Sequence, residues 1–118
     1  MTTKTIKPRV EVMFRACADR TRLRILQLLL QGELCVCDLV NVIDAPQPTI
    51  SRHLAYLRRA GLVVVRKEGL WCHYRLAPAD SAFHDKLLKC LAACANEVPG
   101  AKGDAKRLQT CERGGCCD

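Results

Sequence analysis

The stretch from residue 33 to residue 60 constrains the fold of this chain most, because it has the pattern of two short helices joined by a four-residue turn. Pro48 stands at the start of the second helix. The backbone N–H at this position has no partner within the helix, so proline is tolerated there. Apolar residues recur at helical spacing on both sides of the turn, at Leu34, Val36, Leu39, Val40, Ile43, Ile50, Leu54 and Leu57. The pattern predicts a helix over residues 33–43, a turn over 44–47 and a helix over 48–60, which together form a helix-turn-helix.

Two further helices are expected before this motif. From Pro8, an apolar stripe marks an amphipathic helix that carries Cys17 on its buried side. Asp19 is a suitable cap for the next helix, whose leucine-rich sequence ends at Gly32. Its broad apolar face predicts that this second helix is the hub of the core.

The sequence after the motif predicts a β-hairpin, or wing, and a last helix. Residues 62–65 and 70–76 are rich in β-branched and aromatic residues, and the intervening turn would place Arg66 and Lys67 at its tip. The last helix should span residues 80–98. No later element is predicted to cover its apolar stripe, so we expect a second copy of the chain to cover it in a twofold dimer.

The expected architecture is therefore mainly α with a small β-hairpin, a homodimeric winged helix-turn-helix. Residues 8–98 would form the DNA-binding and dimerisation domain. Glycines and charges dominate residues 99–118, which predicts a flexible, cysteine-containing tail.

Composition points to a polyanionic partner. The chain has 118 residues, with 19 basic and 12 acidic side chains and a net charge of +7. A small basic protein gains binding free energy from counterion release on nucleic acid. No apolar run approaches the roughly 18 residues of a membrane span, and the first seven residues lack a secretory signal, so we expect a cytoplasmic protein with no membrane contact.

The nine cysteines are expected to be free or metal-bound, because the count is odd and the compartment is reducing. Cys35 and Cys37 are best placed for chemistry. In the first turn of a helix their pKa values should be lowered by the helix dipole. Side chains two apart in a helix face nearly opposite sides, so one soft ion would bind both sulfurs only by unwinding that turn. This predicts a switch that displaces the second helix of the motif.

Polar and basic side chains of the second helix and the wing are candidates for double-stranded DNA contact. Those expected to read or clamp DNA are Gln47, Thr49, Ser51, Arg52 and His53. Those expected to hold phosphates are Arg58, Arg59, Arg66, Lys67 and Arg75.

Three segments carry a family resemblance: ELCVCDL at residues 33–39, QPTISRHLAYLRRAGLV at 47–63 and GLWCHYRL at 69–76. Together they resemble the arsenic-responsive branch of the ArsR/SmtB family of winged helix-turn-helix repressors. The resemblance implies a homodimer that binds operator DNA of an arsenic-resistance operon and dissociates when As(III) or Sb(III) binds Cys35 and Cys37. It implies no organic cofactor.

The chain departs from the family's motif at the position of a third cysteine, where it has Val40. The third sulfur ligand is then either missing or supplied from elsewhere, and the candidates are Cys17, Cys72, Cys111, Cys116 and Cys117. Thr49 replaces a lysine frequent in relatives, so the operator sequence can differ.

Other functions remain open at this stage. The pair could respond to another soft metal, such as Cd or Pb, or to thiol oxidation. A thiol oxidoreductase or a metal-sequestering protein is a further alternative. Against an enzyme, the chain has no C-x-x-C in a βαβ setting, no nucleotide loop and no base-paired nucleophile.

Overall fold

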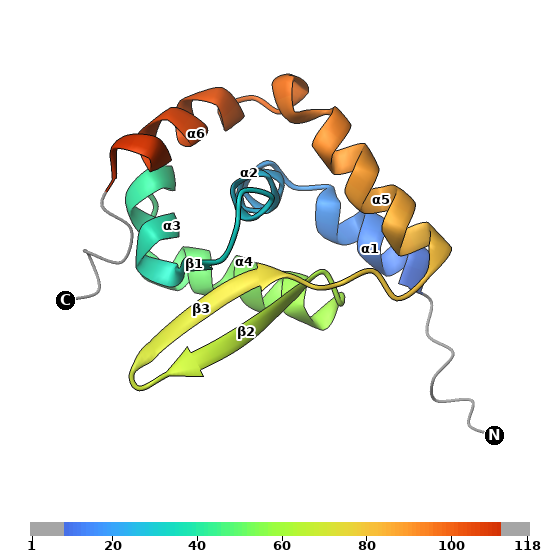
Figure 1. The fold of residues 1–118 in the computed structure, drawn as a ribbon, viewed down its shortest axis with the longest axis horizontal. Coiled ribbons are helices and arrows are strands. Elements are labelled where there is room, and N and C mark those ends of the chain that lie inside the picture. Colours follow the sequence, from blue (N-terminus) through green and yellow to red (C-terminus); the bar gives the residue numbers. More distant parts are fainter. Residues whose placement is uncertain (1–8, 112–118) are drawn as a thin grey trace.

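The helices of the chain surround one central helix, and a β-hairpin extends from the helical body (Figure 1). The structure is a computed structural model, and it describes residues 9–111. The elements in order are α1 (Arg9–Cys17), α2 (Arg20–Leu29), β1 (Leu34–Cys35), α3 (Val36–Ile43), α4 (Gln47–Arg59), β2 (Val63–Glu68), β3 (Trp71–Leu76), α5 (Ala82–Ala93), the 3₁₀ helix η2 (Ala95–Glu97) and α6 (Ala101–Thr110).

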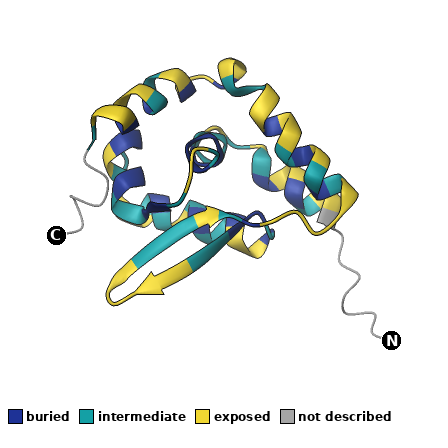
Figure 2. Cartoon of the chain, in the orientation of Figure 1, coloured by how far each residue is buried: buried dark blue, intermediate teal, exposed yellow. Residues whose placement is uncertain are grey.

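Helix α2 is the hub of the core, as the sequence predicts. Asp19 caps it by accepting the backbone N–H of Arg22 at 3.0 Å. Every residue from 25 to 29 is buried, and the helix lies in the middle of the others (Figures 1 and 2). Burial on all sides explains why this segment is apolar except for Gln27, whose side chain is hydrogen-bonded.

Helices α3 and α4 form the predicted helix-turn-helix. Asp44 ends α3 in the left-handed conformation, with φ of 63°, and so reverses the chain. Helix α4 starts at Gln47, one residue earlier than expected, so Pro48 takes the second position instead of the first. Ile50, Leu54 and Leu57 face the core and leave the polar side of α4 outward.

The wing is part of a three-stranded sheet in the order β1-β3-β2. The hairpin turn consists of Gly69 and Leu70, and positive φ at Gly69 alone is the pattern of a type II′ turn. The predicted tip was wrong, because Arg66 and Lys67 lie within β2. Strand β1 was not predicted. It pairs Cys35 with His73, which joins the segment before α3 to the wing.

Helix α5 is shorter than the predicted 80–98 helix, and its apolar stripe is partly covered within one chain. Leu87 and Leu91 are buried, and Gln27 of α2 donates to the carbonyl of Leu91 at 2.7 Å. The chain thus covers part of the stripe itself, while Phe83 and Leu88 are only partly buried, so cover of the remainder by a second copy stays a prediction. Open apolar surface remains on α1, where Val10 is 49% and Phe14 55% exposed, and at the tip of the wing, where Leu70 and Trp71 are exposed.

The tail is not flexible throughout, because residues 101–110 form helix α6. Asp104, only 1% exposed, accepts two hydrogen bonds of 2.7 Å from Arg24 of α2 and one of 2.6 Å from Arg107. Arg107 donates in turn to the carbonyl of Val42 at 2.9 Å. Helix α6 thus packs on both α2 and α3 (Figure 1), and the predicted boundary at residue 98 cuts through the folded unit.

None of the helices within residues 9–111 has the length and apolar character needed to cross a membrane.

Candidate metal centre and nucleic-acid interface

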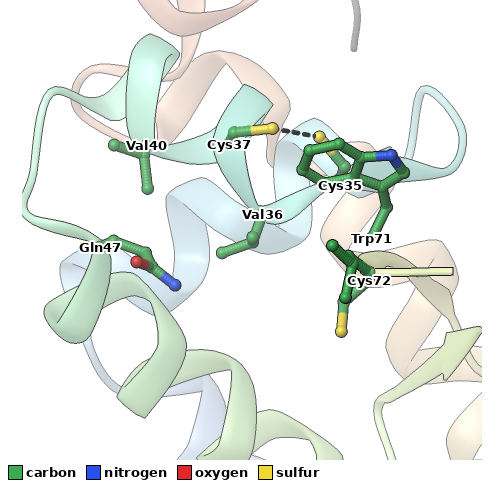
Figure 3. Close-up of a pocket in the computed structure, with 8 residues that line it drawn as sticks. Cys35, Val36, Cys37, Val40, Gln47, Trp71 and Cys72 are labelled. Atoms are coloured by element: carbon green, nitrogen blue, oxygen red, sulfur yellow. Dashed lines mark hydrogen bonds between the residues drawn. The ribbon is translucent and has the colours of Figure 1, made fainter. Parts of the chain in front are cut away.

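Cys35 and Cys37 bring their sulfur atoms to 2.7 Å from each other (Figure 3). Cys35 is the N-cap of α3 and has an extended backbone, with φ of −86° and ψ of 163°. Because α3 begins only at Val36, the two residues do not share a helical turn. The prediction that their side chains face apart was wrong, and one ion can reach both sulfurs without unwinding the helix.

A reciprocal pair of contacts closes the N-terminus of α3. The carboxylate of Asp38 accepts the backbone N–H of Cys35 at 3.2 Å, and the side chain of Cys35 accepts the backbone N–H of Asp38. Burial raises the pKa of Cys35 above its usual value, although the N–H of Asp38 acts in the opposite direction. The prediction of a lowered pKa was therefore wrong for Cys35, because desolvation outweighs the helix terminus.

The cysteine pair borders a cavity of about 360 Å³, which we call the thiol pocket. Three parts of the fold meet there: the β1–α3 junction, the first residue of α4 and the tip of the wing (Figure 3). The pocket is lined by Cys35, Val36, Cys37, Val40, Gln47, Leu70, Trp71 and Cys72. Sequence reasoning assigned Gln47 to DNA and gave no ligand role to Leu70 or Trp71, because their approach to α3 depends on the unpredicted pairing of β1 with β3.

No third sulfur joins the pair among residues 9–111, where no group of three possible metal ligands is found. Cys72 lines the same pocket, but its sulfur points away from the pair (Figure 3). Cys111 follows α6 and accepts from Asn41 of α3 at 3.8 Å, and Val40 presents only methyl groups. Cys116 and Cys117 lie outside the described residues.

Cys17 lies in a different part of the fold, at the end of α1. Burial raises its pKa to about 11, and the nearby thiols of Cys90 and Cys94 on and after α5 act in the same direction. Cys17 is therefore placed with the α5 cysteines and apart from the thiol pocket.

The outward side of α4 carries most of the predicted DNA-contacting residues. Gln47 and Arg52 are exposed, and Thr49 and Ser51 are partly exposed. His53 departs from the expectation, because its Nδ1 lies 3.4 Å from Arg22 and 3.8 Å from Asp19 at the start of α2. Burial lowers its pKa, with Asp19 acting in the opposite direction. His53 therefore ties α4 to α2.

Arg66 also has partners within the chain. Its guanidinium contacts Glu33 at 2.7 Å and Glu68 at 3.4 Å, so it pins β2 to the segment before β1. A phosphate would compete with two carboxylates for this side chain. The other predicted phosphate contacts, Arg58, Arg59, Lys67 and Arg75, are all exposed.

Comparison with known proteins agrees with this architecture. Residues 19–65 match the family described as "Bacterial regulatory protein, arsR family". The "Arsenical resistance operon repressor" of Escherichia coli (strain K12) is 50% identical over 86 residues, which are 72% of this chain and 74% of that protein. The "Arsenic resistance transcriptional regulator ArsR1" of Pseudomonas putida is 46% identical over 79 residues, 66% of this chain and 62% of that protein.

A solved structure shares the fold. The homodimeric winged helix-turn-helix DNA-binding domain of Mb0332 from Mycobacterium bovis, a possible ArsR-family transcriptional regulator, superposes with a TM-score of 0.66 at 32% identity. The alignment covers 82% of this chain and 88% of that one. These relatives are regulators and not enzymes. On this sequence identity and shared fold, the chain belongs to the arsR family of bacterial regulatory proteins and is a winged helix-turn-helix transcriptional repressor.

Proposed function

We propose that this repressor binds operator DNA of an arsenic-resistance operon in the cytoplasm and releases it when As(III) or Sb(III) binds Cys35 and Cys37. The observation that carries the proposal is the 2.7 Å approach of the two sulfurs at the edge of a pocket bordered by the first residue of α4. Thiolates are soft ligands and suit soft ions. The arsenical-resistance names of the relatives support the same inducer class.

The position of the pocket suggests how binding reaches DNA. A ligand held by the two sulfurs lies between α3, Gln47 and Trp71, so it acts on the reading helix and the wing together. Pairing of Cys35 with His73 transmits a displacement of β1 directly to β3. A coupling of about 1 to 3 kcal/mol would weaken operator binding by about 5- to 150-fold, enough to open a promoter.

In the DNA complex, α4 is proposed to enter the major groove with Gln47, Thr49, Ser51 and Arg52. Arg58, Arg59, Lys67 and Arg75 would contact phosphates. The net charge of +7 favours such a partner. A homodimer like that of Mb0332 would place its two α4 helices about 34 Å apart, to meet successive grooves.

Replacing Arg52 by Ala tests the reading helix. The side chain is exposed, so its removal should leave the fold intact. Operator affinity should fall by about 1 to 3 kcal/mol. Fluorescence anisotropy with labelled operator measures this, and Lys102→Ala on the exposed side of α6 is the control. Unchanged affinity would exclude α4 as the reader.

The inducer site is tested with the double variant Cys35→Ser, Cys37→Ser. Operator affinity should stay within about twofold, while release by arsenite or antimonite is lost. Cys90→Ser, at an exposed position of α5, is the matched control and should respond as the wild type does. If the double variant still released operator DNA at the arsenite concentrations that act on the wild type, Cys35 and Cys37 would not be the inducer site. Release of operator DNA by the wild-type protein in response to Cd(II) or peroxide, but not to arsenite, would identify a different inducing signal.

A further inference from the structure

Arg22 of α2 contacts α1 and α4, the two helices that pack on α2 on either side of its first turn (Figure 1). We infer that Arg22 and His53 are positioning residues that hold α4 in a fixed place relative to α1, and that they thereby set the spacing of half-sites that a dimer accepts. The inference rests on the proposed binding of operator DNA by α4, but not on the inducer. We call Arg22 and its contacts with these two helices the α1–α4 link.

The guanidinium of Arg22 holds the end of α1. Its Nε donates to the carbonyl of Ala16 at 2.7 Å, and its Nη2 donates to the carbonyl of Arg15 at 3.3 Å. Both carbonyls lie in the last turn of α1, where a helix no longer provides the regular backbone donors. A guanidinium suits this place, because it carries several donors in one plane and a charge that is favoured at the C-terminal end of a helix. Arg22 therefore fixes the end of α1 to the start of α2.

The same guanidinium also contacts α4. Its Cζ lies 4.0 Å from the centre of the Tyr56 ring, and its Nη1 lies 3.4 Å from Nδ1 of His53. Arginine has donors only, so His53 accepts at Nδ1 and is neutral in this contact. His53 and Tyr56 are three residues apart and share one face of α4. Two contacts on one face restrain both the distance of α4 from α2 and the rotation of α4 about its own axis.

The surroundings of His53 favour its neutral form. Oδ2 of Asp19 lies 3.8 Å from Nδ1 of His53, and the same oxygen accepts the backbone N–H of Arg22 at 3.0 Å as the cap of α2. The other charged groups that face the imidazole are Arg22 of α2 and Arg52 of α4. Burial is the largest influence and lowers the pKa of His53; Asp19 acts in the opposite direction, and the two cations act with burial. The acceptor that Arg22 needs is therefore present at neutral pH.

Packing alone does not fix α4 against α1. A cavity of about 140 Å³ lies between the two helices, and it is lined by Val12, Arg15, Tyr56, Arg59 and Ala60. Close-packed side chains define the relative position of two helices, and a cavity removes such contacts. Arg15 and Tyr56 line this cavity and are also contacted by Arg22, so the α1–α4 link spans the place where packing is loose.

The position of α4 relative to α1 matters because α1 carries surface that a second copy would cover. Val10 and Phe14 are exposed there. The two α4 helices of a dimer must meet major grooves about 34 Å apart. Twofold symmetry repeats any displacement of α4 in both protomers, so the two displacements add. Loss of the α1–α4 link should therefore weaken binding to two half-sites at once and leave binding to one half-site unchanged.

The test measures binding of the full chain to three labelled DNA probes by fluorescence anisotropy. The probes are the operator, a single half-site, and an operator lengthened by two base pairs between its half-sites. His53→Ala and Arg22→Lys should each weaken operator binding at least about tenfold, since the two half-sites are no longer bound together, and should keep half-site binding within about twofold. The preference for the operator over the lengthened probe should shrink in both variants. Arg20→Lys, at an exposed position of α2, is the matched control and should bind all three probes as the wild type does.

The comparison of probes separates positioning from direct contact. Equal losses on the operator and on the half-site would make His53 or Arg22 a DNA contact and overturn the inference. Unchanged binding of both variants to all three probes would overturn it as well. Arg52→Ala, which removes a proposed base contact, should weaken the operator and the half-site alike. If Arg52→Ala weakened neither, the proposed reading role of α4 would fail, whatever the result for the α1–α4 link.

His53→Asn separates loss of the acceptor from damage to α4. The amide oxygen of the new side chain takes the place of Nδ1, so operator binding should recover to within about threefold of the wild type. Chemical denaturation records the stability of each variant, and Arg22→Lys with His53→Asn carries the comparison if His53→Ala unfolds. A His53→Asn protein of wild-type stability that binds the operator as weakly as His53→Ala would overturn the role of the acceptor.

The pH dependence of operator binding gives an independent readout. An imidazolium has no acceptor at Nδ1 and faces the cations of Arg22 and Arg52, so wild-type binding should weaken at acidic pH relative to His53→Asn at the same pH. A histidine that contacts phosphate would instead bind more tightly when it is protonated. Tighter relative binding of the wild type at acidic pH would therefore overturn the inference.

Discussion

At the scale of single residues, the N-cap role of Cys35 would compete with its proposed role as a ligand for the same sulfur atom. As the N-cap of α3 it accepts the backbone N–H of Asp38, and as a ligand it would share its electrons with arsenic. The residue is also 2% exposed, so burial favours the neutral thiol. Binding of the proposed inducer at neutral pH would therefore include loss of a proton from a thiol that holds it more tightly than usual.

The raised pKa of Cys35 predicts a steep pH dependence of its reactivity. Below its pKa the thiolate fraction rises about tenfold per pH unit, so alkylation by iodoacetamide should keep accelerating through pH 9. Peptide mass spectrometry of the segment containing Cys35 measures the rate. In urea-unfolded protein the same segment should level off near the ordinary thiol pKa of about 8.5. A plateau at or below that pH in folded protein would contradict the prediction.

The same shift sets a direction for stability. Since the folded state binds the proton of Cys35 more tightly than the unfolded state, its contribution is fully present below the ordinary thiol pKa. It is lost as pH rises through the folded-state value. The buried thiol of Cys17, with a pKa of about 11, acts in the same direction, so stability should fall at alkaline pH.

At the scale of elements, α6 links the end of the fold to the helix-turn-helix. Asp104 joins Arg24 of α2 and Arg107 of α6, and Arg107 reaches the carbonyl of Val42 near the end of α3. The carboxylate is buried and satisfied by three donors. Helix α3 is therefore held from both sides, by α4 and by α6.

Replacing Asp104 by Ala should destabilise the protein by about 3 kcal/mol, because removing one partner of a buried pair leaves the other charge uncompensated. Chemical denaturation followed by circular dichroism measures the change. The matched control is Asp85→Ala, which removes an exposed ion pair with Lys89 and should cost less than about 0.5 kcal/mol. Equal effects of the two substitutions would mean that α6 does not stabilise the core.

Local patterns predicted the elements that depend on local sequence. Helix α2, helix α4 and the hairpin followed from apolar spacing, a capping residue and a glycine with positive φ. Helix α6 was not predicted, because its glycines and charges are typical of a flexible segment. The ion pair that holds it joins Arg24 and Asp104, which are 80 positions apart in the sequence. Strand β1 was missed for a related reason. Its two residues are a strand only because β3 pairs with them from about 40 positions away.

The sequence singled out the two cysteines of the candidate site, whose role stays a prediction, but it did not predict their geometry. The sequence identified Cys35 and Cys37, while their convergence depends on where α3 begins. The pocket that they border depends on the approach of Trp71 and Leu70, which follows from the β1–β3 pairing. Partners distant in sequence also explain why His53 and Arg66 contact their own chain.

At the scale of the whole molecule, the remaining open apolar surface bears on dimerisation. Phe14 of α1 is 55% exposed, although its ring meets that of Phe83 of α5 edge-on at 5.2 Å between centroids. Val10, one turn earlier, is 49% exposed. Exposed apolar patches of this kind mark interaction surfaces, and a twofold partner would cover the α1 and α5 surface symmetrically.

Phe14→Ser should therefore shift the protein from dimer to monomer, because it removes the largest apolar group from this surface while the core residues Met13 and Ala16 are untouched. Analytical ultracentrifugation measures the mass. Operator affinity should fall by at least tenfold, since a monomer holds only one half-site. The control is Leu70→Ser, which removes a more exposed apolar residue at the wing and should leave the mass unchanged. A Phe14→Ser protein that remains a dimer, or a wild type that is monomeric, would place the interface on another surface.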